Sequence, residues 1–170
     1  MNWLKRAIFD SPVQNCLPWE KHNSDVMSCI CRVTNNRTGR TDEVEVFTKL
    51  TYVPSPDAIF GAHGLAPPNA VAIGFAVNGN TSDLTNDMNM RILSTAIAKC
   101  KEIVDAVKPK YLVMTWNQLQ TRRGPFYKAI LSRTFPNFRT IRMDGGVGLL
   151  ENDNYRQDEP PPGNPYRFSK

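Results

Sequence analysis

The sequence predicts a mixed α+β domain, in which helices flank a central sheet. Two apolar strands, residues 70–77 and 111–116, are each followed by a helical pattern, at 86–107 and 124–134. Strands that alternate with helices favour a sheet that contains a parallel pair. Alternating strands joined by turn signals stand before and after this unit and favour antiparallel hairpins. Together these observations predict a mixed sheet.

We expect one domain over residues 1–152, because 170 residues suffice to bury one core. Residues 153–170 are rich in proline and have almost nothing apolar to bury, which predicts a mobile tail. The chain has no apolar run of membrane-spanning length, and its first residues are too quickly polar for a secretory signal. We therefore expect a cytoplasmic protein.

The first third predicts a short helix and a hairpin. Residues 2–10 have the pattern of an amphipathic helix, and residues 12–25 are irregular. Residues 26–33 and 43–53 alternate as strands, and NNRTGR at 35–40 is a turn signal between them. The apolar face of the second strand is predicted to comprise Val44, Val46, Leu50 and Tyr52.

The middle of the chain predicts the buried elements. Residues 54–69 form a loop rich in proline and glycine, of a length usual for binding or lid roles. Residues 70–77 are apolar throughout, as in a central strand buried on both faces. Residues 86–107 predict a helix that Pro109 ends. Its core-facing side chains are Leu93, Ala96, Ile97, Cys100, Val104 and Val107.

The last part predicts the strand 111–116, the helix 124–134 and a closing hairpin of residues 137–143 and 147–151. The glycines between its strands resemble a phosphate loop superficially, but a hairpin turn explains them better. These glycines are Gly145, Gly146 and Gly148.

The cysteines predict buried free thiols rather than a metal site or disulfides. Cys29 and Cys31 point to one face of a strand, where neighbouring positions do not pair easily. The histidines, His22 and His63, are isolated, and the chain has no second close cysteine pair. The other cysteines are Cys16 and Cys100.

Positive charge is concentrated in residues 91–143, which carry 11 basic and 2 acidic side chains. This net charge of +9 favours a polyanionic partner, such as a phosphorylated cofactor, nucleic acid or an acidic protein surface. A solvated helix face, with lysines suited to a helix end, explains part of it equally well.

The order of elements, the lead-in LPWEKHNSD and the segment RRGPFY, with Arg123 and Tyr127 four apart, carry a resemblance. Over residues 19–151 the chain resembles the GNAT superfamily of acyltransferases, and more closely the small GNAT-like proteins of tailed bacteriophages. The resemblance implies a mixed sheet whose fourth and fifth strands splay apart. It also implies that acetyl-CoA lies in that gap.

The resemblance places the pantetheine arm of acetyl-CoA against the backbone of Ile73, Phe75 and Val77. The pyrophosphate would lie at the start of the next helix, where backbone N–H groups are unpaired. That loop maps onto residues 85–90, and its contributors are Thr85, Asn86, Asn89 and Met90. The family loop is rich in glycine, whereas LTNDMNM has none and contains Asp87. Arg122 and Arg123 are candidates to clamp a phosphate, although solvated surface arginines are the default interpretation of this pair.

The resemblance also implies two catalytic residues. Asn117 closes the fifth strand, where its amide would orient cofactor or substrate. Tyr127 corresponds to the tyrosine that reprotonates the departing CoA thiolate, although a packed aromatic explains it as well. Trp116 fits a cleft-lining core aromatic better than a base-stacking platform. Candidate bases bordering an acceptor site are Glu43, Glu45, Asp57 and His63.

Three functions follow as expectations. The first is transfer of an acetyl group from acetyl-CoA to an amine, in a protein encoded by a phage and acting in the host cytoplasm. The second is a catalytically inactive GNAT-like scaffold that binds a host or virion protein through its basic face, residues 91–143. The third is non-specific nucleic-acid binding, disfavoured because aromatics do not interleave with the basic residues.

Overall fold

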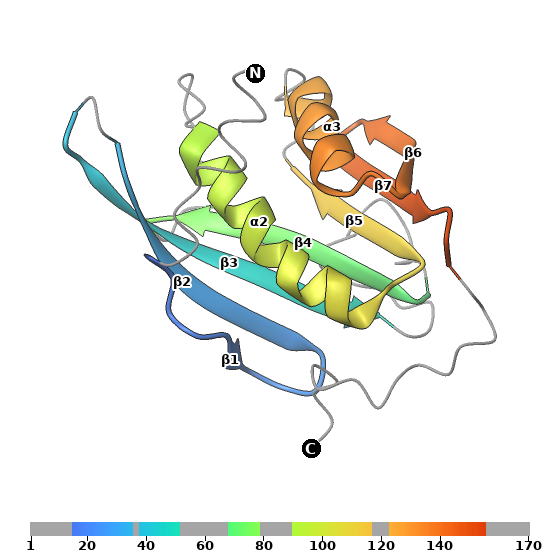
Figure 1. Cartoon of the computed structure of the whole chain (residues 1–170), viewed down its shortest axis with the longest axis horizontal. Helices are drawn as coiled ribbons and strands as arrows, with labels where there is room; N and C mark the ends of the chain where they lie inside the picture. Colours follow the sequence, from blue (N-terminus) through green and yellow to red (C-terminus); the bar gives the residue numbers. More distant parts are fainter. Residues whose placement is uncertain (1–14, 36–37, 52–67, 79–89, 117–122, 156–170) are drawn as a thin grey trace.

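The computed structural model describes residues 15–35, 38–51, 68–78, 90–116 and 123–155. They form a seven-stranded sheet with two helices side by side on one face (Figure 1). The predicted α+β class with a mixed sheet is confirmed. The predicted helix 2–10, most of the loop 54–69 and the tail beyond residue 155 lie outside the described residues.

The strands run in the spatial order β1-β2-β3-β4-β5-β7-β6, and all neighbours are antiparallel except β4 and β5. The strands are β1 Glu20–Lys21, β2 Val26–Thr34, β3 Thr41–Thr51, β4 Ala70–Val77, β5 Tyr111–Thr115, β6 Phe138–Asp144 and β7 Val147–Asn152. The helices are α2 Met90–Val107 and α3 Arg123–Thr134. The predicted hairpins and the two predicted helices are therefore confirmed where the structure describes them.

Strand β1 was not predicted, because residues 12–25 read as irregular. It pairs through two residues only, Glu20 with Ser28 and Lys21 with Met27. The reversal into β2 is held by Asn23, whose Oδ1 accepts hydrogen bonds from the backbone N–H groups of Asp25 and Val26 at 2.8 and 3.0 Å. A side chain that caps its own turn stabilises the reversal, and two residues are too few to show a strand period.

The two central strands pair over only part of their length. Their register runs from Ala70 opposite Tyr111 to Ile73 opposite Met114. Strand β4 continues to Val77, and β3 pairs with it as far as that residue. The β4 backbone beyond Ile73 is therefore bonded on its β3 side and has no register with β5.

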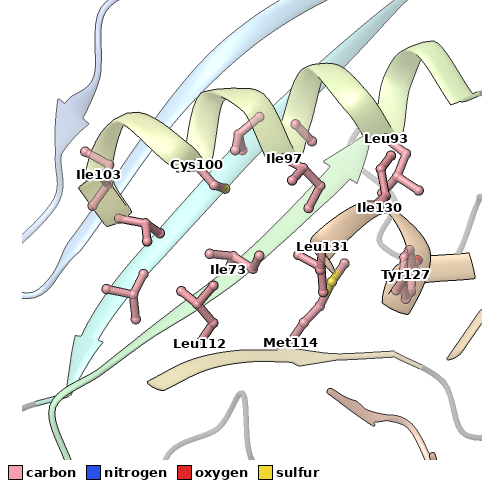
Figure 2. Packing of buried hydrophobic residues seen from close by; sticks show 14 of the residues in the cluster. Ile73, Leu93, Ile97, Cys100, Ile103, Leu112, Met114, Tyr127, Ile130 and Leu131 are labelled. Carbon is pink, nitrogen blue, oxygen red and sulfur yellow. The ribbon is translucent and has the colours of Figure 1, made fainter. Parts of the chain in front are cut away.

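The main core lies between the helices and the sheet (Figure 2). One face of α2 supplies Leu93, Ile97 and Cys100, each at most 1% exposed, and β4 and β5 supply Ile73 and Leu112 from below. The apolar spacing along α2 predicted this face correctly, although Val107 is only partly buried. A second, smaller cluster covers the other face of the sheet and comprises Ala70, Ala72, Val113 and Val147.

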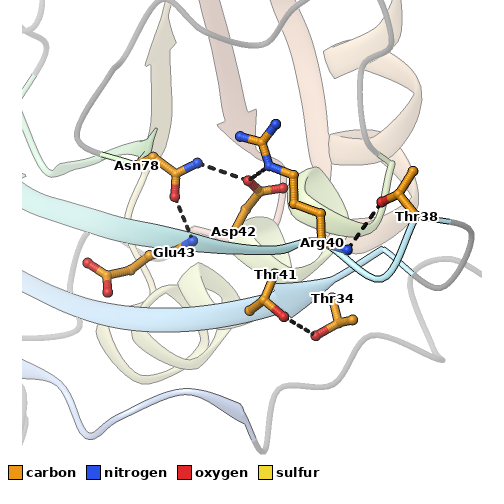
Figure 3. A network of polar contacts seen from close by, with 7 residues as sticks. All are labelled: Thr34, Thr38, Arg40, Thr41, Asp42, Glu43 and Asn78. Carbon is orange, nitrogen blue, oxygen red and sulfur yellow. Dashed lines mark hydrogen bonds and ion pairs between the residues drawn. The ribbon is translucent and has the colours of Figure 1, made fainter.

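A polar network ends strand β4 (Figure 3). Asn78, in a left-handed conformation with φ of 51°, donates its backbone N–H to the carbonyl of Glu43 at 2.7 Å. Its side-chain Oδ1 accepts the N–H of Glu43 at 2.9 Å, and its Nδ2 donates to the buried Asp42 at 2.9 Å. Arg40 Nε also donates to Asp42, at 3.0 Å. The network fixes the point where the chain leaves the sheet towards α2.

Candidate functional site

The C-terminal end of β5 and the first turn of α3 bring Trp116, Arg123 and Tyr127 together. The rings of Trp116 and Tyr127 meet edge to face, with centroids 5.3 Å apart and planes at 68°. Arg123 is one helical turn before Tyr127, and their side chains are hydrogen bonded. Because a guanidinium has no acceptor, Arg123 donates to the phenol oxygen.

Tyr127 is 1% exposed and belongs to the main core. Burial raises the pKa of its hydroxyl, and the charge and hydrogen bond of Arg123 oppose this only in part. The phenol is therefore protonated at neutral pH, and its oxygen is held by Arg123. A hydroxyl in this state can donate its proton to another group, as a general acid must.

Two glycines make room for Trp116. A Cβ on Gly124 would lie 2.9 Å from the carbonyl oxygen of Met143 and 3.4 Å from the Trp116 ring. A Cβ on Gly148 would lie 2.9 Å from the sulfur of Met143 and 3.4 Å from the same ring. Gly148 thus lies in strand β7 and packs against Trp116. The sequence reading of Gly145 and Gly146 as a hairpin turn is confirmed, since their φ values are 59° and 83°.

Strand β4 approaches this cluster with small or inward-facing side chains. Ile73 and Val77 are buried and Phe75 is half-buried, and all three contact the core beneath α2. Gly74 faces open space, because a Cβ built on it would have no atom within 4 Å. Beyond Ile73 no described strand pairs with the edge of β4 that faces β5, and the open space at Gly74 lies on the sheet face away from α2.

Of the other predicted site residues, the structure describes few. Met90 begins α2, while the remaining loop candidates lie outside the described residues: Thr85, Asn86, Asn89, Asn117, Arg122, Asp57 and His63. Glu43 is exposed and Glu45 is half-buried, both on the face of β3 away from α2. Arg123 is 5% exposed, so the reading of this residue as a solvated surface arginine is wrong. Its spacing of four from Tyr127 is the signal that could have shown the pairing.

The prediction that all cysteines are free thiols is wrong for two of them. Cys16 and Cys31 form a disulfide, and Cys29 and Cys100 are buried free thiols as predicted. Neighbours on one strand do not pair, as argued, but the partner comes from the segment before β1, which lies beside β2. No set of three or more His, Cys, Asp or Glu side chains among the described residues is arranged to hold a metal ion.

The basic residues of 91–143 do not form one free surface. On α2, Lys99 pairs with Glu102 at 2.9 Å and Lys101 with Asp105 at 2.6 Å. On β6, Arg139 pairs with Glu151 at 3.0 Å and Arg142 with Asp144 at 2.8 Å. These ion pairs compensate part of the positive charge of the segment locally. Exposed Lys128 and Arg133 on α3 add to its charge.

Comparison of the chain with protein-family models, with curated proteins and with solved structures found no match. Within the part of the chain that is described, neither helix has the length and apolar character needed to cross a bilayer.

Proposed function

We propose that the chain is a GNAT-like acyltransferase, which moves an acetyl group from acetyl-CoA to an amine. One observation carries this proposal. The only parallel strand pair in the described sheet ends at Ile73 and Met114, while β4 continues and the protonated Tyr127 lies on α3 beyond β5. A strand edge that pairs with no described strand, together with a protonated tyrosine in the same core, suits a ligand that has both amides and a leaving thiolate.

The pantetheine arm of acetyl-CoA contains amide groups that can pair with a free strand edge as another strand would. The edge of β4 beyond Ile73 offers such groups, since no described strand pairs with it there. The Asn78 network anchors the far end of β4, so this edge is held rigidly. Rigid placement lowers the entropic cost of binding.

The reaction needs a proton at one place. The amine nitrogen bonds to the thioester carbon, the carbon–sulfur bond breaks, and the sulfur leaves as a thiolate. Tyr127 would donate its phenol proton to that thiolate, and Arg123 would stabilise the phenolate left behind, since it already donates to the same oxygen. Trp116 holds the Tyr127 ring from the side. The acceptor attacks as the uncharged amine, and its nitrogen then loses one proton to water or to a base as the amide forms.

Thermal unfolding tests the binding step. A ligand that binds the native state raises the melting temperature by mass action. At a ligand concentration of one hundred times Kd, the free energy of unfolding rises by about 2.7 kcal/mol. We expect acetyl-CoA to raise it and ATP at equal concentration to leave it nearly unchanged. ATP is the matched control because it has a similar nucleotide and similar charge but no pantetheine arm. No shift at millimolar acetyl-CoA would contradict the proposal, and equal shifts would indicate general anion binding to basic residues.

A non-catalytic scaffold is the second candidate. The glycine-free stretch LTNDMNM favours it, because side chains at that position hinder close approach of a pyrophosphate to backbone. In this case the chain would bind a host or virion protein through the basic segment 91–143, and acetyl-CoA would not stabilise it. The thermal experiment therefore separates the two candidates.

A further inference from the structure

All four cysteines of the chain gather between β2 and α2, although they come from three separate segments. Cys16 and Cys31 are joined as a disulfide. The sulfur of Cys29 lies 3.9 Å from that of Cys31. Cys100 on α2 is close enough to Cys29 for the two thiols to interact electrostatically. The proposed transferase chemistry uses none of these sulfurs.

We propose that this cluster is a redox-responsive site, in which a dithiol reduces the Cys16–Cys31 disulfide and thereby detaches residues 15–19 from the rest of the domain. A reductant has access to only one end of the disulfide. Cys31 is fully buried, whereas Cys16 is partly exposed between the exposed residues Asn15 and Leu17. A reductant therefore reaches the Cys16 sulfur first.

The exchange is balanced without any further reagent. A thiolate of the dithiol attacks the Cys16 sulfur, the Cys16–Cys31 bond breaks, and Cys31 leaves as a thiolate. The second thiol of the dithiol then attacks the reagent's first sulfur, which is bound to Cys16. This step releases Cys16 and closes the reagent into a cyclic disulfide. The protein gains two thiols, and the dithiol is oxidised by the same two electrons.

Cys29 is placed to assist the leaving sulfur. Cys31 Sγ carries no hydrogen while it is in the disulfide, so the thiol of Cys29 must be the donor in their contact. The same S–H faces the thiolate that forms at Cys31 during reduction. Burial raises the pKa of the Cys29 thiol to about 11, which keeps this donor protonated at neutral pH. Cys29 is thus a positioning residue for the exchange.

Besides the disulfide, the segment that reduction would free is held by an isolated β-bridge between Cys16 and Cys31 and by few other contacts. Leu17 N–H donates to the carbonyl of Ile30 at 2.8 Å, and the Trp19 ring is half-buried against the core. Lys99 Nζ lies 5.7 Å from the centre of the Trp19 ring. The indole N–H of Trp19 is buried without a hydrogen-bond partner, which costs free energy in the closed position. The disulfide is the strongest constraint that keeps Trp19 there.

A redox-responsive role also agrees with the cytoplasmic location predicted from sequence. Disulfides in reducing compartments are usually transient and serve catalysis or redox sensing, whereas permanent ones belong to oxidising compartments. Trp19 contacts Lys99 of α2, and reduction would uncover this part of the helix. The site does not depend on the proposed transfer reaction.

Thiol counting and fluorescence test the proposal on the full chain. Denatured without reductant, the protein should show two free thiols, and after treatment with dithiothreitol in the native state it should show four. The native reduced protein should have red-shifted tryptophan emission. Trp19→Phe should lack this shift, because Trp19 is the tryptophan that lies in the segment held by Cys16. Four thiols before reduction, two thiols in excess dithiothreitol, or four thiols with unchanged emission would each overturn the proposal.

Two sets of variants sharpen the test. Cys16→Ser should show the red-shifted emission without reductant and no further response to dithiothreitol; a wild-type-like spectrum would contradict detachment. Cys29→Ser and Cys29→Ala remove the same sulfur, but only serine keeps a donor. We expect the disulfide to be reduced several-fold more slowly in Cys29→Ala than in Cys29→Ser, and equal rates would contradict the donor role. If either variant fails to fold, the wild-type measurements decide alone.

Discussion

The two halves of the sheet are built differently. In one half α2 packs on β2 and β3, and the sulfur cluster of Cys16, Cys29, Cys31 and Cys100 lies between the helix and these strands. In the other half α3 packs on β6 and β7 (Figure 1), and Trp116 and Tyr127 form an aromatic pair in the core there.

The two halves meet where residues 70–73 of β4 pair with residues 111–114 of β5, and where α2 and α3 pack together in one continuous core. Each half is a set of antiparallel strands under its own helix, braced by its own contacts. The register between β4 and β5 is short because β5 ends at Thr115, directly after Met114. Changes to one cluster should therefore affect stability there, and only the Tyr127 cluster should affect acetyl transfer.

The largest expected effect is on transfer. Tyr127→Phe keeps the packed ring but removes the proton donor, so kcat should fall by about 10²–10⁴-fold while acetyl-CoA binding is retained. Steady-state kinetics with acetyl-CoA and a panel of amines measures this. Tyr111→Phe, which changes a half-buried tyrosine on β5, is the matched control. Equal activity of Tyr127→Phe and wild type would remove Tyr127 from the mechanism.

The second largest effect is on the stability of the half of the sheet that carries the cysteine cluster. Cys16→Ser removes a disulfide between residues 15 apart in sequence. A constraint of that loop length stabilises a fold by about 3 kcal/mol. Urea unfolding of the oxidised proteins measures the loss, and wild type with dithiothreitol should show a similar one. A change below about 0.5 kcal/mol in both would show that the cross-link does not brace this half.

A smaller effect distinguishes two glycines. Gly124→Ala should destabilise the fold by about 1–2 kcal/mol, because its Cβ would press on the Met143 carbonyl and the Trp116 ring. Gly74→Ala should be neutral or stabilising by up to about 1 kcal/mol, since its Cβ meets open space and alanine restricts the unfolded chain. Chemical unfolding of both variants checks the sign of each change. The same sign for both would contradict the packing described around Trp116.

The smallest effect is on pH dependence. Burial raises the pKa of Cys29 from 9.0 to about 11, so its thiol stays protonated in the folded state when it has already ionised in the unfolded state. Its contribution to stability is therefore complete below about pH 9 and is lost as the pH rises towards about 11. Unfolding free energies across this range should fall less steeply in Cys29→Ala than in wild type. Tyr127, whose pKa is also raised by burial, makes the same kind of contribution in the other half.

Local patterns in the sequence were enough to predict most of the fold. The continuous apolar run of residues 70–77 predicted a central strand, and the helical spacing of Leu93, Ile97 and Cys100 predicted the buried face of α2. Both signals come from the spacing of apolar residues within one element. This spacing does not depend on which element packs against it. The turn of residues 145–146 was predictable for the same reason.

Contacts between distant segments were not predictable in this way. The disulfide requires Cys16 to lie opposite Cys31, and the two-residue strand β1 that brings it there has no period of its own. The burial of Arg123 depends on Tyr127 and on the surrounding core. The charge of Arg123 and its neighbours in sequence suggested a surface arginine instead. In the candidate site, sequence predicted Tyr127, Arg123 and Trp116 as separate candidates, and the structure brings them together and adds Gly124.

The central claim is that the gap beyond the short β4–β5 register receives acetyl-CoA. Calorimetric titration of acetyl-CoA into the wild-type protein tests it most directly, with ATP as the matched titrant. We predict saturable binding of one acetyl-CoA per chain with a negative heat-capacity change, as burial of the apolar arm requires, and much weaker binding of ATP. No heat beyond dilution at millimolar acetyl-CoA, or equal affinity for ATP, would contradict the account.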